Sequence, residues 1–168
     1  RILATAFPPT AGAAPILGRD LISSPASVRP FLGVVFQHPS LDNKLTVREN
    51  LIHGGRLYGL SGSALSARIE DMLGRYRLAD RAGDACGSLS GGLRRRVELA
   101  KSLLHGPKIV LLDEPSTGLD PAARRDLWAH LRTLKAEGAT ILATTHLMDE
   151  GDRCDRVVVD SGVARIGL

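Results

Sequence analysis

Two adjacent carboxylates, Asp113 and Glu114, follow the stretch 108–112, which is apolar after Lys108. Pro115 stops the run, whose length and aliphatic side chains predict a strand buried on both faces of a parallel sheet. Ligands of open α/β sheets bind beyond the carboxyl ends of the strands. One carboxylate there can hold a metal ion, and a second can orient or deprotonate a water molecule. An Asp-Glu pair alone is commonly two solvated acids, so this interpretation needs support from other residues.

Two further polar side chains follow apolar runs that predict strands. Gln37 ends the run at 33–36, and His146 follows the run at 140–145. A lone Gln is more often an ordinary loop residue, and a lone His is usually structural. With Asp113 and Glu114, however, they would place three strand tips at one edge of the sheet, where Gln37 could contact a metal-bound water or a phosphate.

The sequence Leu-Ser-Gly-Gly at 89–92 opens a predicted helix that Gly106-Pro107 stops. The unpaired N–H groups, the helix dipole and the glycines make such a start an anion site. A plain Ser-Gly-Gly helix cap is the favoured alternative for this motif alone. Within the helix we expect Arg94 to pair with Glu98. The expected apolar face comprises Leu93, Val97, Ala100 and Leu104.

A second helix follows the carboxylate pair. Asp120 is placed to cap it, and Pro121 takes its first position. Gly138 is expected to end it. Its predicted buried positions are Leu127, Leu131 and Leu134.

Residues 45–82 have helical patterns and no strand signal. Thr46 and Glu49 form a predicted capping box. A second helix follows the serines at 61–63, with apolar residues at helical spacing. We expect a small helical subdomain between two strands of the sheet. Its second helix should bury Leu65, Ile69, Met72, Leu73 and Tyr76.

The two ends of the chain have weaker patterns. Residues 1–20 are predicted to hold the tail of a helix, a proline-rich turn and a short strand near 14–17. Residues 21–32 predict a short helix and a loop. Near the other end, a short helix at 147–153 precedes a hairpin whose turn is Asp160-Ser161-Gly162.

Composition restricts the function classes. The 168 residues suit one domain, with 43% hydrophobic and 24% charged residues, as in soluble globular proteins. No apolar run approaches the ~20 residues that span a bilayer, and no signal peptide pattern is present. The two cysteines favour a reducing cytosol. The net charge of +4 is mild, and we expect Arg94–Arg96 to be a solvated helix face rather than a nucleic-acid site.

The order and spacing of these motifs are specific together. The chain resembles the nucleotide-binding domain of ABC transporters over nearly its whole length. The resemblance implies an α/β fold with a P-loop NTPase-like parallel sheet core at 1–44 and 88–168. It also implies an inserted helical subdomain at 45–87, within a single partial domain truncated at its N-terminus. The ligands implied are ATP and Mg²⁺.

The resemblance implies a role for each residue at the strand tips. Gln37 matches the Q-loop glutamine, which contacts Mg²⁺ and its waters and reports the nucleotide state to the permease. Asp113 matches the Walker B aspartate that supports Mg²⁺. Glu114 matches the catalytic glutamate that polarises the attacking water, and His146 matches the histidine that contacts the γ-phosphate.

The same resemblance implies roles for the residues at the helix starts. Ser90, Gly91 and Gly92 match the signature motif, which binds the γ-phosphate of the ATP held by the opposite subunit. Asp120 matches the D-loop aspartate that reaches across the dimer. Leu93 departs from the usual Gln of this motif, but several exporter-type branches tolerate an apolar residue there.

A second departure concerns the P-loop, G-x-x-x-x-G-K-[ST], which holds the phosphates in this family. No Gly-Lys pair occurs in the 168 residues. We therefore expect that the N-terminal part of the domain is missing, that the chain begins near the end of the helix after the P-loop, and that it is inactive alone.

Residues 39–51 and 93–100 are similar to the exporter branch that includes drug-resistance, nodulation-factor and polysaccharide ATPases. The ATPase of that branch is a separate polypeptide on the inner face of the plasma membrane, without membrane insertion. It docks on its permease through the groove just after Gln37 and works with a second ATP-binding subunit, which we expect to form a homodimer. Two alternatives remain open: a non-transport ABC ATPase acting on ribosomes or DNA, and a non-catalytic or regulatory remnant without a P-loop.

Overall fold

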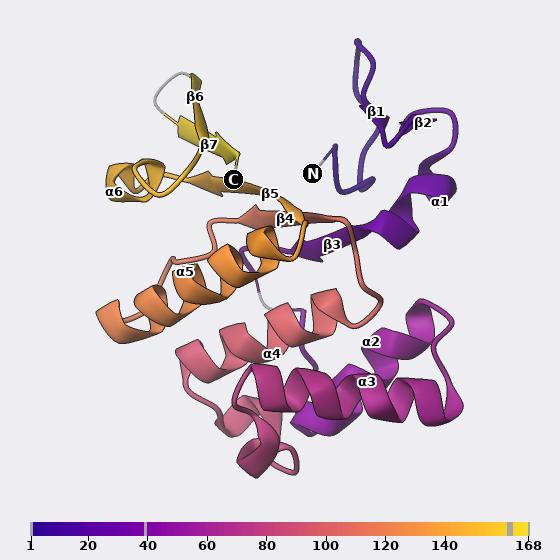
Figure 1. The fold of residues 1–168 in the computed structure, drawn as a ribbon, viewed down its shortest axis with the longest axis vertical. Helices are drawn as coiled ribbons and strands as arrows, with labels where there is room; N and C mark the ends of the chain where they lie inside the picture. The colour runs from indigo at the N-terminus through magenta and orange to yellow at the C-terminus, as the bar shows by residue number, and fades with distance from the viewer. Residues whose placement is uncertain (1, 39, 161–162, 168) are drawn as a thin grey trace.

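The computed structural model describes residues 2–38, 40–160 and 163–167. Its centre is a five-stranded sheet in the order β3-β4-β5-β7-β6 (Figure 1). The first three strands are parallel, and the last two form an antiparallel pair at one side. The predicted parallel sheet is therefore confirmed. The strands are β3 (Leu32–Val35), β4 (Ile109–Asp113), β5 (Thr140–Thr145), β6 (Arg156–Asp160) and β7 (Val163–Gly167).

Strand β4 lies between two parallel neighbours because its side chains suit burial on both faces. Val110, Leu111 and Leu112 are all buried. The register sets Asp113 opposite Thr144 of β5. Since the strands run parallel, the residues that follow β3, β4 and β5 emerge at the same edge of the sheet.

Two long helices cover one face of the sheet (Figure 1). These are α4 (Gly91–Leu103) and α5 (Pro121–Ala136). Asp120 caps α5, as predicted. The predicted apolar positions of α5 are buried, and the unpredicted Trp128 is buried with them. A shorter helix, α6 (Met148–Gly151), follows β5.

Helix α4 has two buried sides, because it lies between the sheet and a further pair of helices (Figure 1). Val97, Ala100 and Leu104 are buried as predicted. The prediction that Arg94 pairs with Glu98 was wrong, because Arg95 makes this pair and is itself buried. The expectation that the arginine run is solvated was therefore also wrong at its central residue. On the sheet side, α4 approaches β3 so closely that a Cβ on Gly33 would lie 2.8 Å from the Ser102 carbonyl oxygen.

The further pair of helices comes from the predicted helical region. It comprises α2 (Val47–Leu57) and α3 (Gly62–Arg75), followed by two 3₁₀ turns at Ala79–Arg81 and Cys86–Ser88. No strand occurs among the described residues between β3 and β4. The capping box of Thr46 and Glu49 is present. The predicted apolar residues of the second helix are buried, as is Tyr76 just beyond its end.

The N-terminal segment crosses above the sheet face that α4 and α5 leave uncovered (Figure 1). The predicted helix tail was wrong, because residues 2–5 form a turn in which Thr5 has a φ of 57°. The Thr5 N–H donates to the carbonyl oxygen of Ile2 at 2.9 Å, which closes a single tight turn and not the i to i+4 bond of an α-helix. The remaining elements are a hairpin of β1 (Pro15–Ile16) and β2 (Arg19–Asp20), then α1 (Pro25–Val28) and a 3₁₀ turn at Arg29–Phe31.

Three predicted features touch residues outside the described part. Arg1 begins the predicted helix tail, Pro39 begins the exporter-like stretch, and Ser161-Gly162 form the predicted hairpin turn. The strands on either side of that turn pair antiparallel as predicted. In the described ranges, every helix is too short or too polar to cross a membrane.

Candidate functional site

Residues that follow three parallel strands meet at one edge of the sheet. The Gln37 amide Nε2 donates to Glu114 Oε2 at 3.1 Å. The His146 imidazole Nδ1 lies 3.4 Å from the other carboxylate oxygen, Oε1. Together with Asp113 at the end of β4, they form what we call the strand-tip cluster. An amide, an imidazole and two carboxylates are thus gathered where α/β sheets bind ligands.

Two threonines complete the strand-tip cluster, and the sequence analysis missed both roles. Thr144 Oγ1 donates to Asp113 Oδ1 at 2.6 Å. Thr117 Oγ1 donates to Glu114 Oε2 at 3.1 Å. Thr144 lies near the end of β5, directly opposite Asp113 in the register. The signal that could have revealed the role of Thr144 is a hydroxyl near the end of one predicted parallel strand and a carboxylate at the end of its neighbour.

The backbone of Glu114 is left-handed, with a φ of 44°. A non-glycine residue in this region costs on the order of 1–3 kcal/mol and persists only where its surroundings hold it. The Glu114 N–H donates to the Thr144 carbonyl oxygen at 3.0 Å. The side chain remains 28% exposed. The chain therefore bends sharply after β4 and presents the carboxylate to solvent at the sheet edge.

Arg95 of α4 holds the backbone beneath the strand-tip cluster. Its guanidinium donates to the carbonyl oxygens of Pro115 and Phe36, each at 3.0 Å. It also pairs with Glu98 at 2.9 Å, and both side chains are less than a tenth exposed. Sequence reasoning missed this residue, because nothing in a run of three arginines tells which one faces the sheet.

The remaining predicted residues lie at the starts of α4 and α5, and we call Ser90, Gly91, Gly92 and Asp120 the helix-start cluster. Ser90 Oγ accepts from the Leu93 N–H at 3.3 Å. Its hydroxyl proton can still be donated to an anion. A Cβ on Gly92 would lie 3.0 Å from Ala123 Cβ, so the two helix starts are in close contact.

Asp120 closes the start of α5. Its Oδ1 accepts from the N–H groups of Ala122 and Ala123 at 2.8 and 2.9 Å. These bonds, chiefly the one from Ala123, lower the pKa of Asp120 below its ordinary value of 3.8. Among the described residues, no hydrogen bond or ion pair joins the helix-start cluster to Gln37, Glu114 or His146. The structure thus sorts the predicted residues into two separate groups.

The donors at the strand tips suit Mg²⁺ rather than a metal held by protein alone. The described residues contain no group of three or more His, Cys, Asp or Glu side chains that could hold a metal. Mg²⁺ typically binds through one or two carboxylates and completes its shell with waters and substrate phosphates. Asp113 supplies such a carboxylate. The Gln37 amide donates its N–H to Glu114, which leaves its carbonyl oxygen available as an acceptor.

Comparison with known proteins identifies the family. A family model described as "ABC transporter" matches residues 1–117 of the chain. The chain belongs to the ABC transporter family. A solved ABC neighbour, described as the ATP-binding subunit of an ABC transporter, has a TM-score of 0.77 and 32% identity, and the match covers 93% of this chain and 66% of that one. The ABC ATPase fold predicted from the motifs is therefore confirmed.

This ABC chain is similar to proteins that are named for export or for drug resistance. Nod factor export ATP-binding protein I of Burkholderia lata is 45% identical over 152 residues, which are 90% of this chain and 50% of the relative. Daunorubicin resistance ATP-binding protein DrrA3 of Streptomyces coeruleorubidus is 41% identical over 164 residues, or 96% and 52% of the two chains. The ABC chain spans about half the length of the curated relatives it matches.

Proposed function

We propose that the full-length protein is the ATP-binding subunit of an ABC exporter, and that it hydrolyses ATP as a dimer on a separate permease. The observation that carries this proposal is the carboxylate of Glu114, which Gln37, Thr117 and His146 surround at the sheet edge. The relatives named for Nod factor export and daunorubicin resistance support the exporter class.

Phosphoryl transfer depends on positioning and on charge neutralisation more than on covalent chemistry. Glu114 is proposed to orient and polarise the attacking water. His146 and Gln37 lie on either side of it, His146 to contact the γ-phosphate and Gln37 to contact the metal's waters. Asp113, held by Thr144, is the proposed Mg²⁺ ligand. Bound Mg²⁺ would neutralise phosphate charge as it develops.

The helix-start cluster is proposed to face the ATP of a second subunit. Ser90, Gly91 and Gly92 would bind its γ-phosphate, because helix starts with glycines favour anions. Asp120 would reach across the same dimer. The 168 residues contain no Gly-Lys pair to supply a P-loop, and we propose that they do not hydrolyse ATP by themselves.

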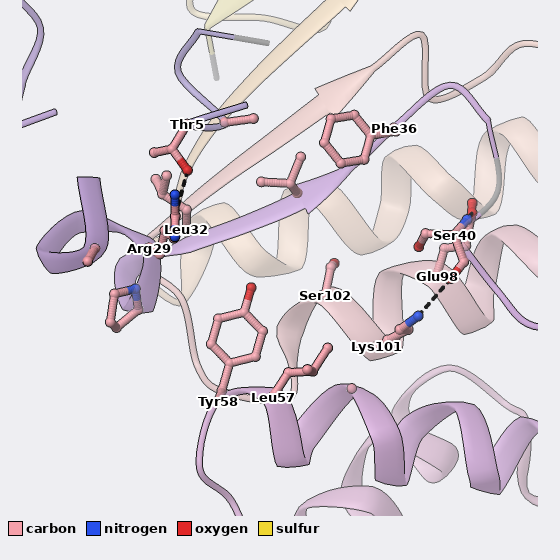
Figure 2. A pocket seen from close by; sticks show the side chains of 15 residues that line it. Thr5, Arg29, Leu32, Phe36, Ser40, Leu57, Tyr58, Glu98, Lys101 and Ser102 are labelled. Atoms are coloured by element: carbon pink, nitrogen blue, oxygen red, sulfur yellow. Dashed lines mark hydrogen bonds between the residues drawn. The ribbon is translucent and has the colours of Figure 1, made fainter. Parts of the chain in front are cut away.

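The permease is proposed to dock between the sheet core (1–44 and 88–168) and the helical subdomain (45–87). A groove of about 750 Å³ lies there, beside the loop that follows β3 (Figure 2). Phe36 lines it from the sheet side, and Leu57 and Tyr58 line it from the end of α2. Leu57 is 82% exposed, which suits an apolar contact with a partner. The subunit would then sit on the cytoplasmic face of the plasma membrane without inserting into it.

Replacing Glu114 by Gln in the full-length protein tests the proposal. We expect steady-state ATP hydrolysis to fall at least about a hundredfold, because general-base roles contribute at least that much. ATP binding should persist, because the amide keeps the shape of the carboxylate. Glu70→Gln, on the exposed side of α3, is the matched control and should hydrolyse ATP normally. Undiminished hydrolysis by Glu114→Gln would refute the assignment.

A non-catalytic remnant is the second candidate, and it requires that no P-loop precedes Arg1 in the full-length protein. Sequencing the gene upstream of the Arg1 codon distinguishes the two. An in-frame G-x-x-x-x-G-K-[ST] a few residues before Arg1 supports the ATPase, whereas a start or stop codon there favours the remnant.

A further inference from the structure

Arg95 and Glu98 form a buried ion pair one turn apart on α4. A surface pair one turn apart would contribute little, but here both side chains have exchanged water for protein partners. All the partners other than the pair itself are backbone groups of the two loops that carry Gln37 and Glu114. The pair therefore links the backbones of these two loops to α4.

The loop carrying Gln37 is held on both sides. Before Gln37, the carbonyl oxygen of Phe36 accepts from Arg95 Nη1 at 3.0 Å. After it, the Ser40 N–H donates to Glu98 Oε1 at 3.0 Å. Figure 2 shows Ser40 and Glu98 meeting at one end of the groove, where Lys101 Nζ also donates to the Ser40 carbonyl at 2.7 Å. The backbone around Gln37 is thereby fixed to α4.

The turn carrying Glu114 is held by the same guanidinium. Arg95 Nε donates to the carbonyl oxygen of Pro115 at 3.0 Å, and Nη2 approaches that of Asp113 at 3.5 Å. These two carbonyls flank Glu114, whose φ of 44° needs outside support. One side chain thus contacts the backbone on both sides of the carboxylate and also the residue before Gln37.

We propose that Arg95, oriented by Glu98, is a positioning residue that fixes the Gln37 amide and the Glu114 carboxylate relative to each other. This inference rests on the proposed ATPase function. A guanidinium is needed because its planar set of five N–H groups can reach carbonyls in two loops and a carboxylate at once. A lysine keeps the charge for Glu98 but lacks this fixed fork.

Three variants of the full-length ATPase test the proposal. Arg95→Lys retains the ion pair and removes the fork. Arg95→Met with Glu98→Gln removes both charges and keeps similar volumes, so that no buried charge is left unpaired. Arg94→Met is the matched control from the neighbouring, half-buried position. The readouts are kcat, the dissociation constant for ATP, thermal stability, and amide hydrogen exchange of residues 36–45 and 113–119.

We expect Arg95→Lys to lower kcat at least about tenfold while ATP affinity stays within about twofold, since displacement of about 1 Å is enough to impair catalysis. Its melting temperature should fall, because buried carbonyl oxygens lose their donor, so kcat is compared at a temperature at which both proteins are folded. Hydrogen exchange in both loops should accelerate in Arg95→Lys and in the double variant, and exchange in α3 should not. Arg94→Met should match the wild type in every readout.

Two results would overturn the positioning role. One is a wild-type kcat in the double variant, and the other is unchanged exchange in both loops of that variant. If the wild-type protein itself lacks ATPase activity, the proposed function fails, but the exchange comparison still decides whether Arg95 holds the loops.

Discussion

The two clusters of candidate residues differ in how their polar groups are satisfied. In the strand-tip cluster, side chains from three strand ends bond to one another, and Glu114 alone contacts Gln37, Thr117 and His146. In the helix-start cluster, Ser90 and Asp120 bond to the backbone of their own helices. The first cluster is assembled within one chain, whereas the second is only a pair of capped helix ends.

This difference indicates what each cluster needs for function. Groups that already contact one another need only a substrate in the right place. Helix ends that offer N–H groups and a dipole need an anion brought to them from outside. The proposed dimer supplies that anion from the second subunit. Five substitutions test this difference between the two clusters.

Ser90→Arg should break the helix-start cluster without affecting the strand tips. The larger side chain would crowd the proposed γ-phosphate site and weaken ATP-driven dimerisation by about a hundredfold, which corresponds to a misfit of about 3 kcal/mol. Size-exclusion chromatography in a Glu114→Gln background measures it. Ser63→Arg, at the start of α3, is the control. Dimerisation that survives Ser90→Arg would contradict the role of this cluster.

Thr144→Val should weaken the strand-tip cluster alone. The change keeps the side-chain shape and removes the hydroxyl that donates to Asp113. Hydrogen bonds to charged groups contribute about 1.5–3 kcal/mol, so kcat should fall about tenfold or more. A Mg²⁺ titration of ATPase activity should shift to higher concentrations, while ATP-driven dimerisation persists. Thr140→Val, at the exposed start of the same strand, should leave both unchanged.

Gly91→Ala and Gly92→Ala separate folding from recognition in the helix-start cluster. A Cβ on Gly91 would meet open space, whereas one on Gly92 would lie 3.0 Å from Ala123. Alanine favours helix over glycine by about 1 kcal/mol, so Gly91→Ala should raise the free energy of unfolding by up to that amount. Gly92→Ala should raise the free energy of unfolding by less, because its Cβ would crowd Ala123. Urea unfolding measures both, and equal gains would show that the helix starts do not pack as described.

Within the folded subunit, Asp120→Asn should keep the helix cap and change the acid dependence of stability. The lowered pKa of Asp120 means that its contribution is fully present above 3.8 and is lost as the pH falls through the lower folded-state pKa. Asparagine caps helices equally well and does not titrate. Urea midpoints measured below and above pH 3.8 should therefore fall less steeply with acid in the variant. Parallel curves would show that this cap does not titrate with folding.

The position of the strand-tip cluster could be predicted from the sequence, because apolar runs predict buried parallel strands and parallel strands place their ends together. This argument is sufficient to predict that Gln37, Glu114 and His146 lie close together. Thr144 could not be found without knowing the register of β4 and β5, which pairs it with Asp113.

Arg95 was missed for a different reason. The apolar spacing of Val97, Ala100 and Leu104 predicts one buried side of α4. The helix in fact has a second buried side, on which Arg95 precedes Leu99 and Leu103 at four-residue intervals. A helix between two layers buries more than one stripe, and only the packed structure shows which arginine faces the sheet.

The contacts of Arg95 with the two loops use backbone carbonyl oxygens, at Phe36, Asp113 and Pro115. Every amino acid carries such an oxygen, so the side chains at these positions can change without removing the acceptors. Specific side chains are required instead on α4, which carries Arg95 and Glu98. Mutations can therefore change the side chains of these loops, while the loop backbone remains held by Arg95 and Glu98 of α4.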